Sequence, residues 1–322
     1  MDGLAAASEA AAGNTAARRR KRRAATPWGI YSYLVPTMLL LAVFSYFPFL
    51  SAFYHSLFEW DGVNASFVGF QNFQRMLQDE ALAASLPNVL ILTAMSIFFA
   101  LTLPLIAAEF IFNLRSQRAQ LFYRFAFTVP LVIPWIVVVL VWQFIYDPID
   151  GPLNALLTGL GLSHLTRAWL ADPNIAIYAI GMLGGGGQGV GFPFVAGLNL
   201  LIYLAGLNNI SREVIDASRL DGANVWQRFW LVDLPLVTGQ IRIVLIISII
   251  VSIQSFQTII LLTRGGPGYS TMVPGMAMYQ NAFEFGRMGY ASAIGVVLFV
   301  VMLAITMLVL NRLKSPTEAD PA

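Results

Sequence analysis

The sequence predicts an all-α polytopic membrane protein with about six transmembrane helices, and three observations support this fold class. Hydrophobic residues make up 57% of the 322 residues and charged residues only 11%, whereas soluble domains carry about 25% charged residues. Six apolar stretches are long enough to cross a bilayer. Basic residues gather between alternate stretches. A water-soluble globule could not bury this much apolar surface, so the bilayer is the expected solvent.

The six predicted spans each reach the roughly 20 residues that a helix needs to cross the hydrocarbon core. They cover residues 29–57, 85–113, 121–146, 175–207, 238–263 and 290–313. Pro104, Pro130 and Pro134 fall inside spans, which is compatible with membrane helices because neighbouring helices can satisfy the freed carbonyls. The expected organisation is a disordered, basic cytoplasmic arm at residues 1–27, a transmembrane domain at 28–314 and a tail at 315–322.

The distribution of Lys and Arg predicts that both termini lie in the cytoplasm. An inside N-terminus places 15 of the 19 basic residues on the cytoplasmic side, as the positive-inside rule requires. The basic cluster at residues 18–23 directly precedes the first apolar run, which favours a role in topology over nucleic-acid binding. That run is also longer than the core of a cleaved signal peptide. The basic residues left outside are Arg75, Arg167, Arg264 and Arg287.

The sequence offers no set of residues for catalysis or metal binding. It has no cysteine, which excludes disulfides, thiolate metal sites and cysteine nucleophiles. His55 and His164 are the two histidines, and each stands beside an apolar stretch without a second ligand nearby. We therefore expect no cofactor, no metal and no enzymatic activity of the chain itself.

A long polar segment, residues 208–235, separates the fourth and fifth predicted spans on the cytoplasmic side. Plain connections are usually much shorter. Ser211 is a suitable N-cap for a short helix that Gly222 can end. A second helical piece follows and is expected to stop at Pro235. Two amphipathic helices of this kind suggest a docking element, and the alternative is a helix that lies on the lipid headgroups.

Residues 216–223 of this segment read DASRLDGA and are followed by Phe229 and by Leu234-Pro235. This pattern resembles the EAA loop of binding-protein-dependent ABC importer permeases, in which E-A-A is followed by a glycine and later by a proline. The resemblance implies a type I (MetI-like) importer permease fold and a coupling helix that seats in a cleft of a cytoplasmic ATPase subunit. It marks as coupling residues Asp216, Ala217, Ser218, Asp221 and Gly222. Asp216 departs from the family's glutamate but keeps the carboxylate, one methylene shorter.

The resemblance extends over most of the chain after the basic arm. It is closest to the first of the two permeases in the maltose and glycerol-phosphate type importers. It implies a bacterial cytoplasmic-membrane location among membrane lipid, a homologous second permease, two ATPase subunits, an extracytoplasmic solute-binding protein and a carbohydrate substrate. Separate ATPase subunits are needed because the chain has no G-x-x-x-x-G-K-[ST] motif. The matching residues are 67–73 (FVGFQNF), Trp142, Gly151 with Asn154, 169–172 (WLAD), 197–207 (GLNLLIYLAGL), 262–267 (LTRGGP) and 289–293 (GYASA).

The fifth predicted span carries three serines at i, i+4 and i+7, which share one helical face, with two glutamines beside them. Polar side chains inside a span face a cavity or another helix, and hydroxyl and amide groups suit a sugar. The alternative is close helix packing through small serines. The resemblance implies solute contacts at the serines and at one asparagine of the fourth span. The predicted pathway residues are Asn199, Ser248, Ser252, Gln254, Ser255 and Gln257.

Two further features leave alternatives open. The glycine-rich run at residues 184–191 is a poor helix former, so it predicts either a break in the transport pathway or close helix packing. Glu109 lies inside an apolar stretch near Asn113 and Arg115. It is expected to snorkel or to be paired, and the alternative is a proton-coupling carboxylate.

Two rival functions are weaker on this sequence. A stand-alone secondary carrier of a small polar solute predicts inverted repeats and intramembrane charges, and the sequence has no evident repeat and few such charges. A membrane-embedded enzyme predicts a clustered acid, base or metal set, which is missing. The expected function is therefore a channel-forming subunit of an ATP-driven importer, for a sugar or sugar-like solute that the sequence does not specify.

Overall fold

The computed structural model describes residues 31, 33–184 and 195–312. The chain divides into two compact units, Met1–Ser51 and Ala52–Ala322. Helix α3 (Val35–Leu41) lies in the first unit and continues through a π-helical turn, η1 (Ala42–Tyr46), into α4 (Phe47–His55), whose last residues belong to the second unit. None of residues 33–50 is buried. An apolar helix with no buried face is suited to lipid contact.

Three of the described helical segments are long and apolar enough to cross a membrane by themselves: Val35–His55, α6 (Glu80–Asn113) and α18 (Met288–Arg312). Two further candidates are bent pairs, Gln117–Val132 with Trp135–Ile145 and Val225–Leu236 with Thr238–Gln254. α6 continues without interruption through Pro104. The expectation that a membrane helix tolerates this proline is confirmed.

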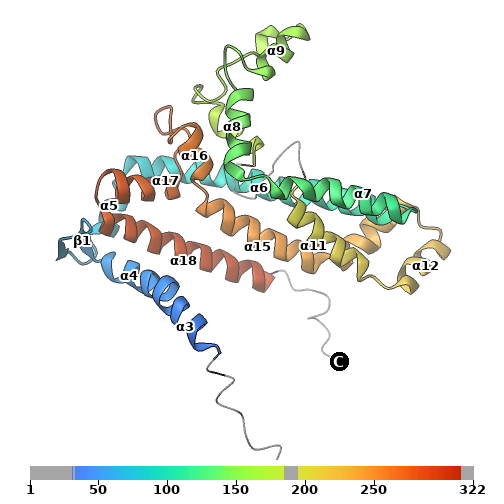
Figure 1. Ribbon diagram of the computed structural model, residues 1–322, viewed down its shortest axis with the longest axis horizontal. Helices are drawn as coiled ribbons and strands as arrows, with labels where there is room; N and C mark the ends of the chain where they lie inside the picture. Colours follow the sequence, from blue (N-terminus) through green and yellow to red (C-terminus); the bar gives the residue numbers. More distant parts are fainter. Residues whose placement is uncertain (1–30, 32, 185–194, 313–322) are drawn as a thin grey trace, which may run out of the picture. The chain divides into compact units, whose positions relative to one another are not determined.

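The predicted third span is not one straight helix. α7 (Gln117–Thr128) leads into a 3-10 turn, η2 (Val129–Val132), and α8 (Trp135–Ile145) then leaves at 88°. Figure 1 shows α8 running away from α7. Pro134 has no N–H to donate, and Ile133 before it is extended, with φ −75° and ψ 121°. A residue that precedes proline avoids the helical region, so two prolines four residues apart break the helix.

The fourth and fifth predicted spans are also composite. The fourth contains α10 (Ala176–Met182) and α11 (Gly197–Asn208). Between them, residues 185–194 lie outside the described residues, and with them all but Gly184 of the glycine-rich run. The fifth contains α15 (Thr238–Gln254) and α16 (Gln257–Leu262), separated by an extended Ser255.

Helix α6 is the centre of the packing in the second unit. It contacts α10, α11, α15 and α17 (Pro274–Tyr279), and α15 in turn contacts α18; Figure 1 shows α6, α15 and α18 alongside one another. Tyr203 of α11 and Leu92 of α6 are fully or almost fully buried in its two main apolar clusters. Asn88 of α6 donates to the carbonyls of Tyr269 and Met272 at 2.9 Å, which satisfies a buried amide.

Polar motif residues hold the connections outside the long helices. β1 (Phe58–Trp60) and β2 (Ala65–Phe67) form an antiparallel hairpin. After it, α5 (Gln71–Met76) carries Asn72, which donates to the carbonyls of Ser56 and Phe58 at 2.9 Å. α9 (Pro152–Gly159) carries Asn154, which donates to two backbone carbonyls and accepts the indole N–H of Trp169. The remaining short turns are η3 (Ser163–Leu165) and η5 (Gln280–Glu284).

The orientation predicted from the basic residues is testable with reporter fusions. We expect fusions after Leu57, Tyr146 and Thr263 to report the outside and fusions after Asn113 and Leu207 to report the cytoplasm, because the positive-inside rule fixes alternate loops. A fusion after residue 313 should also report the cytoplasm. A cytoplasmic signal from the connection at residues 148–172 would contradict the six-span topology.

Candidate functional site

The first helix of the predicted docking segment is α12 (Arg212–Leu220), and both of its ends are set by local sequence. The Ser211 hydroxyl accepts the N–H of Val214 at 3.5 Å. At the other end, Gly222 has φ +79°. Its N–H donates to Arg219, and the Ala223 N–H donates to Ser218. This pair of bonds is a Schellman motif, which requires a left-handed residue at the position of Gly222. The predicted helix limits are confirmed.

The second helical piece begins at a capping box, in which Asn224 and Gln227 each accept the other's backbone N–H. α13 (Val225–Arg228) continues through a π-helical turn, η4 (Phe229–Asp233), into α14 (Leu234–Leu236). Pro235 does not stop this piece, because it lies inside α14, the helical turn that continues η4 to Leu236. The direction changes after Pro235 instead, at Val237, and α15 leaves at 68°.

The surface of this segment combines charge with exposed apolar side chains. Asp216 and Arg219 form an ion pair at 3.3 Å, and both side chains are 65% exposed. Ala217, Asp221 and Gly222 are also exposed. Leu220 is 89% and Trp226 70% exposed. Exposed apolar groups next to charges are typical of a surface that binds another protein or a membrane surface.

Two side chains of this segment serve α12 itself. Ser218, one of the predicted coupling residues, is buried, and its hydroxyl donates to the Ile215 carbonyl at 2.7 Å. The hydroxyl of Ser218 is therefore engaged within α12. The pKa of Glu213 lies below its ordinary value because its carboxylate accepts a hydrogen bond from its own backbone N–H and one from Ser211.

A buried charge cluster joins the second helical piece to the end of α6, and sequence reasoning did not assemble it. The Arg228 Nε lies 2.8 Å from the Asp233 carboxylate, and its Nη2 lies 3.4 Å from Glu109 and also donates to Asn113. Asn113 donates to Glu109 Oε1 at 2.6 Å. We name these four residues the Arg228 cluster. Glu109 is thus paired, as one of the alternatives predicted, but with Arg228 and not with the nearby Arg115.

The predicted pathway residues separate into two groups. Asn199, Ser248, Ser252 and Ser255 are buried, whereas Gln254 and Gln257 are exposed. The Ser252 hydroxyl accepts a hydrogen bond from Thr93 of α6 at 3.1 Å, and Ser248 donates to its own helix at the Val244 carbonyl. Ser255 caps α15 and lies beyond its last helical residue. In this arrangement Ser248 and Ser252 pack between α15 and its neighbours, and solute contact at all six positions stays a prediction.

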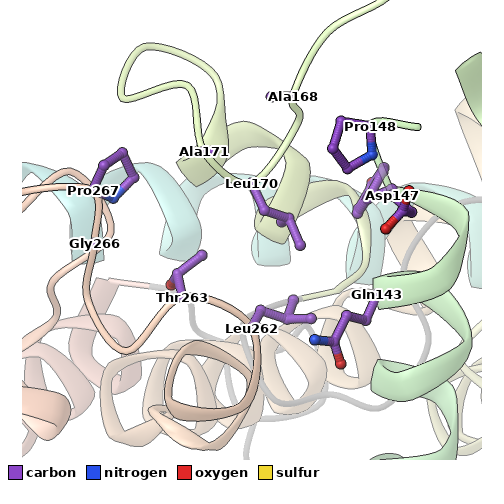
Figure 2. Close-up of a pocket in the computed structure, with 11 residues that line it drawn as sticks. Gln143, Asp147, Pro148, Ala168, Leu170, Ala171, Leu262, Thr263, Gly266 and Pro267 are labelled. Carbon is purple, nitrogen blue, oxygen red and sulfur yellow. The ribbon is translucent and has the colours of Figure 1, made fainter. Parts of the chain in front are cut away.

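A pocket of about 430 Å³ lies at the ends of α8 and α16. Figure 2 shows Gln143 and Asp147 on one side of it and Thr263 on the other, with Leu170 and Leu262 between them. Asp147 Oδ1 accepts the N–H groups of Ile149 and Asp150 at 2.9 Å, and these bonds lower the pKa of Asp147. In the predicted orientation this pocket opens on the extracytoplasmic side. No group of three or more acidic, histidine or cysteine side chains suited to a metal ion occurs among the described residues.

The chain is similar to known permeases over nearly its whole length. The family model described as "Binding-protein-dependent transport system inner membrane component" matches residues 100–316. The probable ABC transporter permease protein YurN of Bacillus subtilis is 31% identical, over 89% of this chain and 97% of its own. The diacetylchitobiose uptake system permease protein NgcF of Streptomyces coelicolor is also 31% identical, over 90% and 84%.

A solved structure has the same fold. A chain of the bacterial ABC transporter involved in the import of the acidic polysaccharide alginate superposes with a TM-score of 0.75 at 24% identity, over 90% of this chain and 96% of that chain. The all-α membrane fold expected from the sequence is therefore confirmed. Together with the matched residues 100–316, it shows that the chain belongs to the family of inner-membrane components of binding-protein-dependent transport systems.

Proposed function

We propose that this chain is a channel-forming subunit of an ATP-driven importer for a carbohydrate or carbohydrate-like solute. The observation that carries the proposal is the docking segment, residues 208–235. It presents the exposed, capped helix α12 with Asp216 and Leu220 on its surface. Such a helix is suited to seat in a cleft of an ATPase subunit, where its carboxylate forms a charge-assisted bond.

Membership of the family supports the remaining subunits of this proposal. A binding-protein-dependent system includes an extracytoplasmic solute-binding protein, and the type I arrangement pairs this chain with a homologous second permease and two ATPase subunits. NgcF is named for diacetylchitobiose uptake, which supports a carbohydrate as the solute here. Both termini lie in the cytoplasm, so that the docking segment shares a compartment with the ATPase.

Reconstitution distinguishes this function from a secondary carrier. We expect proteoliposomes that contain this chain, the second permease and the ATPase subunits to accumulate a labelled di- or oligosaccharide only with ATP and the solute-binding protein present. The reason is that the chain has no G-x-x-x-x-G-K-[ST] motif of its own and depends on ATPase subunits bound at its docking segment. Uptake driven by an ion gradient through this chain alone would favour the secondary carrier and contradict the proposal.

A further inference from the structure

The Arg228 cluster is unusually well removed from water for a group of three ionisable residues. The side chains of Arg228, Asp233 and Glu109 are 5%, 0% and 12% exposed. One guanidinium serves two carboxylates, and Glu109 Oε2 and Asp233 Oδ1 have no hydrogen-bond partner among the described residues. Withdrawing Arg228 would leave two buried carboxylates without a counter-ion, which is strongly unfavourable.

The Arg228 cluster also fixes the orientation of the docking segment relative to α6. A guanidinium donates in a rigid planar fork. Here, one edge of Arg228 faces Asp233 in its own segment and the other faces Glu109 and Asn113 in α6. The guanidinium also lies 5.7 Å from the ring centre of Phe112. The docking segment can therefore neither slide along α6 nor rotate on it without breaking buried charge contacts.

The exposed ion pair on α12 behaves differently. Asp216 and Arg219 are 65% exposed, and an exposed pair contributes little to stability. Asp216 can thus exchange Arg219 for a cationic partner at low cost. The docking segment therefore carries two different charge contacts. The exposed Asp216–Arg219 pair can be exchanged for a pair with a partner protein, whereas the buried Arg228 cluster cannot open without a large cost.

Helix α6 also contacts the predicted solute pathway, so a displacement of α6 would move residues there. Thr93 lies sixteen residues before Glu109 in the same helix, about 24 Å away at 1.5 Å per residue. Thr93 donates to Ser252 of α15. α6 is therefore in direct contact with both the docking segment and the serine-bearing helix.

We infer that the Arg228 cluster is the joint that makes the docking segment and α6 move as one body, with Arg228 as its positioning residue. The inference rests on the proposed function and deepens it by naming the contact through which motion of the ATPase is transmitted to the membrane helices. Motion of the ATPase is transmitted through α12 to the cluster and from there along α6 to α15.

Spin labels test the joint directly. The chain has no cysteine of its own, so labels on cysteines introduced at Glu213 and Ile106 report one distance between α12 and α6. Both positions are exposed. In the assembled complex, provided that the labelled chain keeps its uptake, we expect the same narrow distance distribution without nucleotide and with ATP bound. A nucleotide-dependent shift of this distance would overturn the inference.

Variants separate the joint from a purely structural role. Arg228→Gln should broaden the distance distribution and lower the solute transported per ATP hydrolysed at least tenfold. Glu109→Gln should act in the same direction and replaces Arg228→Gln if that variant fails to insert. The matched control is Arg264→Gln, which removes an ion pair whose side chains are 72% and 32% exposed and should leave both readouts unchanged. Normal distance and normal coupling in Arg228→Gln and Glu109→Gln would overturn the inference.

The test also distinguishes the joint from the proposed function. If the wild-type chain retains no ATPase subunits or transports without ATP, the proposed function fails. The distance distribution of the chain without nucleotide still compares the wild type with Arg228→Gln. An equally narrow distribution in the two would overturn the joint independently.

Discussion

Asp216→Lys is expected to abolish the coupling of ATP hydrolysis to solute uptake while the protein still inserts with its normal topology. The exposed carboxylate of Asp216 is expected to meet an arginine of the ATPase subunit, and a lysine replaces this charge-assisted bond with repulsion. The measurements are the amount of ATPase subunit that co-purifies and the solute-stimulated hydrolysis rate. Asp216→Glu is the matched control and should be tolerated, because it keeps the carboxylate and restores the glutamate of the EAA pattern.

Gly222→Val should produce the same defect through the backbone. A left-handed conformation costs an L-residue about 1–2 kcal/mol, which is a factor of roughly 5–30 in the population of the capped helix. A Cβ at Gly222 meets no atom within 4 Å, so steric contact inside the chain does not contribute. Gly222→Asn adds a side chain but tolerates this conformation, and it should keep most activity. Full ATPase retention and full stimulated hydrolysis in Asp216→Lys and Gly222→Val would show that the segment is not the coupling element.

Ser252→Leu and Ser255→Leu are the second pair of changes with a large expected effect, a loss of uptake in an intact complex. Ser252 is only 2% exposed and contacts Thr93, so a leucine there overpacks the contact between α15 and α6, at about 1–3 kcal/mol. It also removes the hydroxyl for which we predict solute contact. Uptake kinetics and subunit stoichiometry are the measurements.

Ser252→Ala separates the two explanations, because it removes the hydroxyl without adding volume. A raised KM for uptake in this variant supports solute contact, whereas an unchanged KM supports helix packing. Normal transport with leucine at both serine positions would contradict the pathway prediction, and so would loss of subunit assembly.

The parts of the fold that local chemistry determines were predictable from sequence. Ser211 and Gly222 end α12 through bonds to residues at most five positions away, and a cap signal of that kind is written in the local sequence. The identity and fold of the membrane domain followed from composition and motif order. The effect of each proline on its helix was predicted less well, because α6 continues through Pro104 whereas the helix breaks at Pro134.

The Arg228 cluster illustrates what the sequence leaves open. Arg228 and Glu109 are 119 positions apart, so no periodicity or spacing connects them. The only signal was an acidic residue in an apolar span, which predicted a partner without naming it. The prediction that three serines share one helical face holds for Ser248 and Ser252 but is wrong for Ser255, because α15 ends at Gln254 and Ser255 is extended. The serine spacing also did not show which helix this face contacts, because helix packing is decided by the whole bundle.

The break at Ile133 and Pro134 limits what can surround α7 and α8. It falls midway along the third predicted span, where the backbone is extended and the helical hydrogen-bond ladder is interrupted. Hydrocarbon offers no donor to the carbonyls that such an interruption leaves open. Acyl chains are therefore a poor neighbour for this turn of the chain. We therefore expect a protein surface or water, and not lipid, beside this turn of the chain.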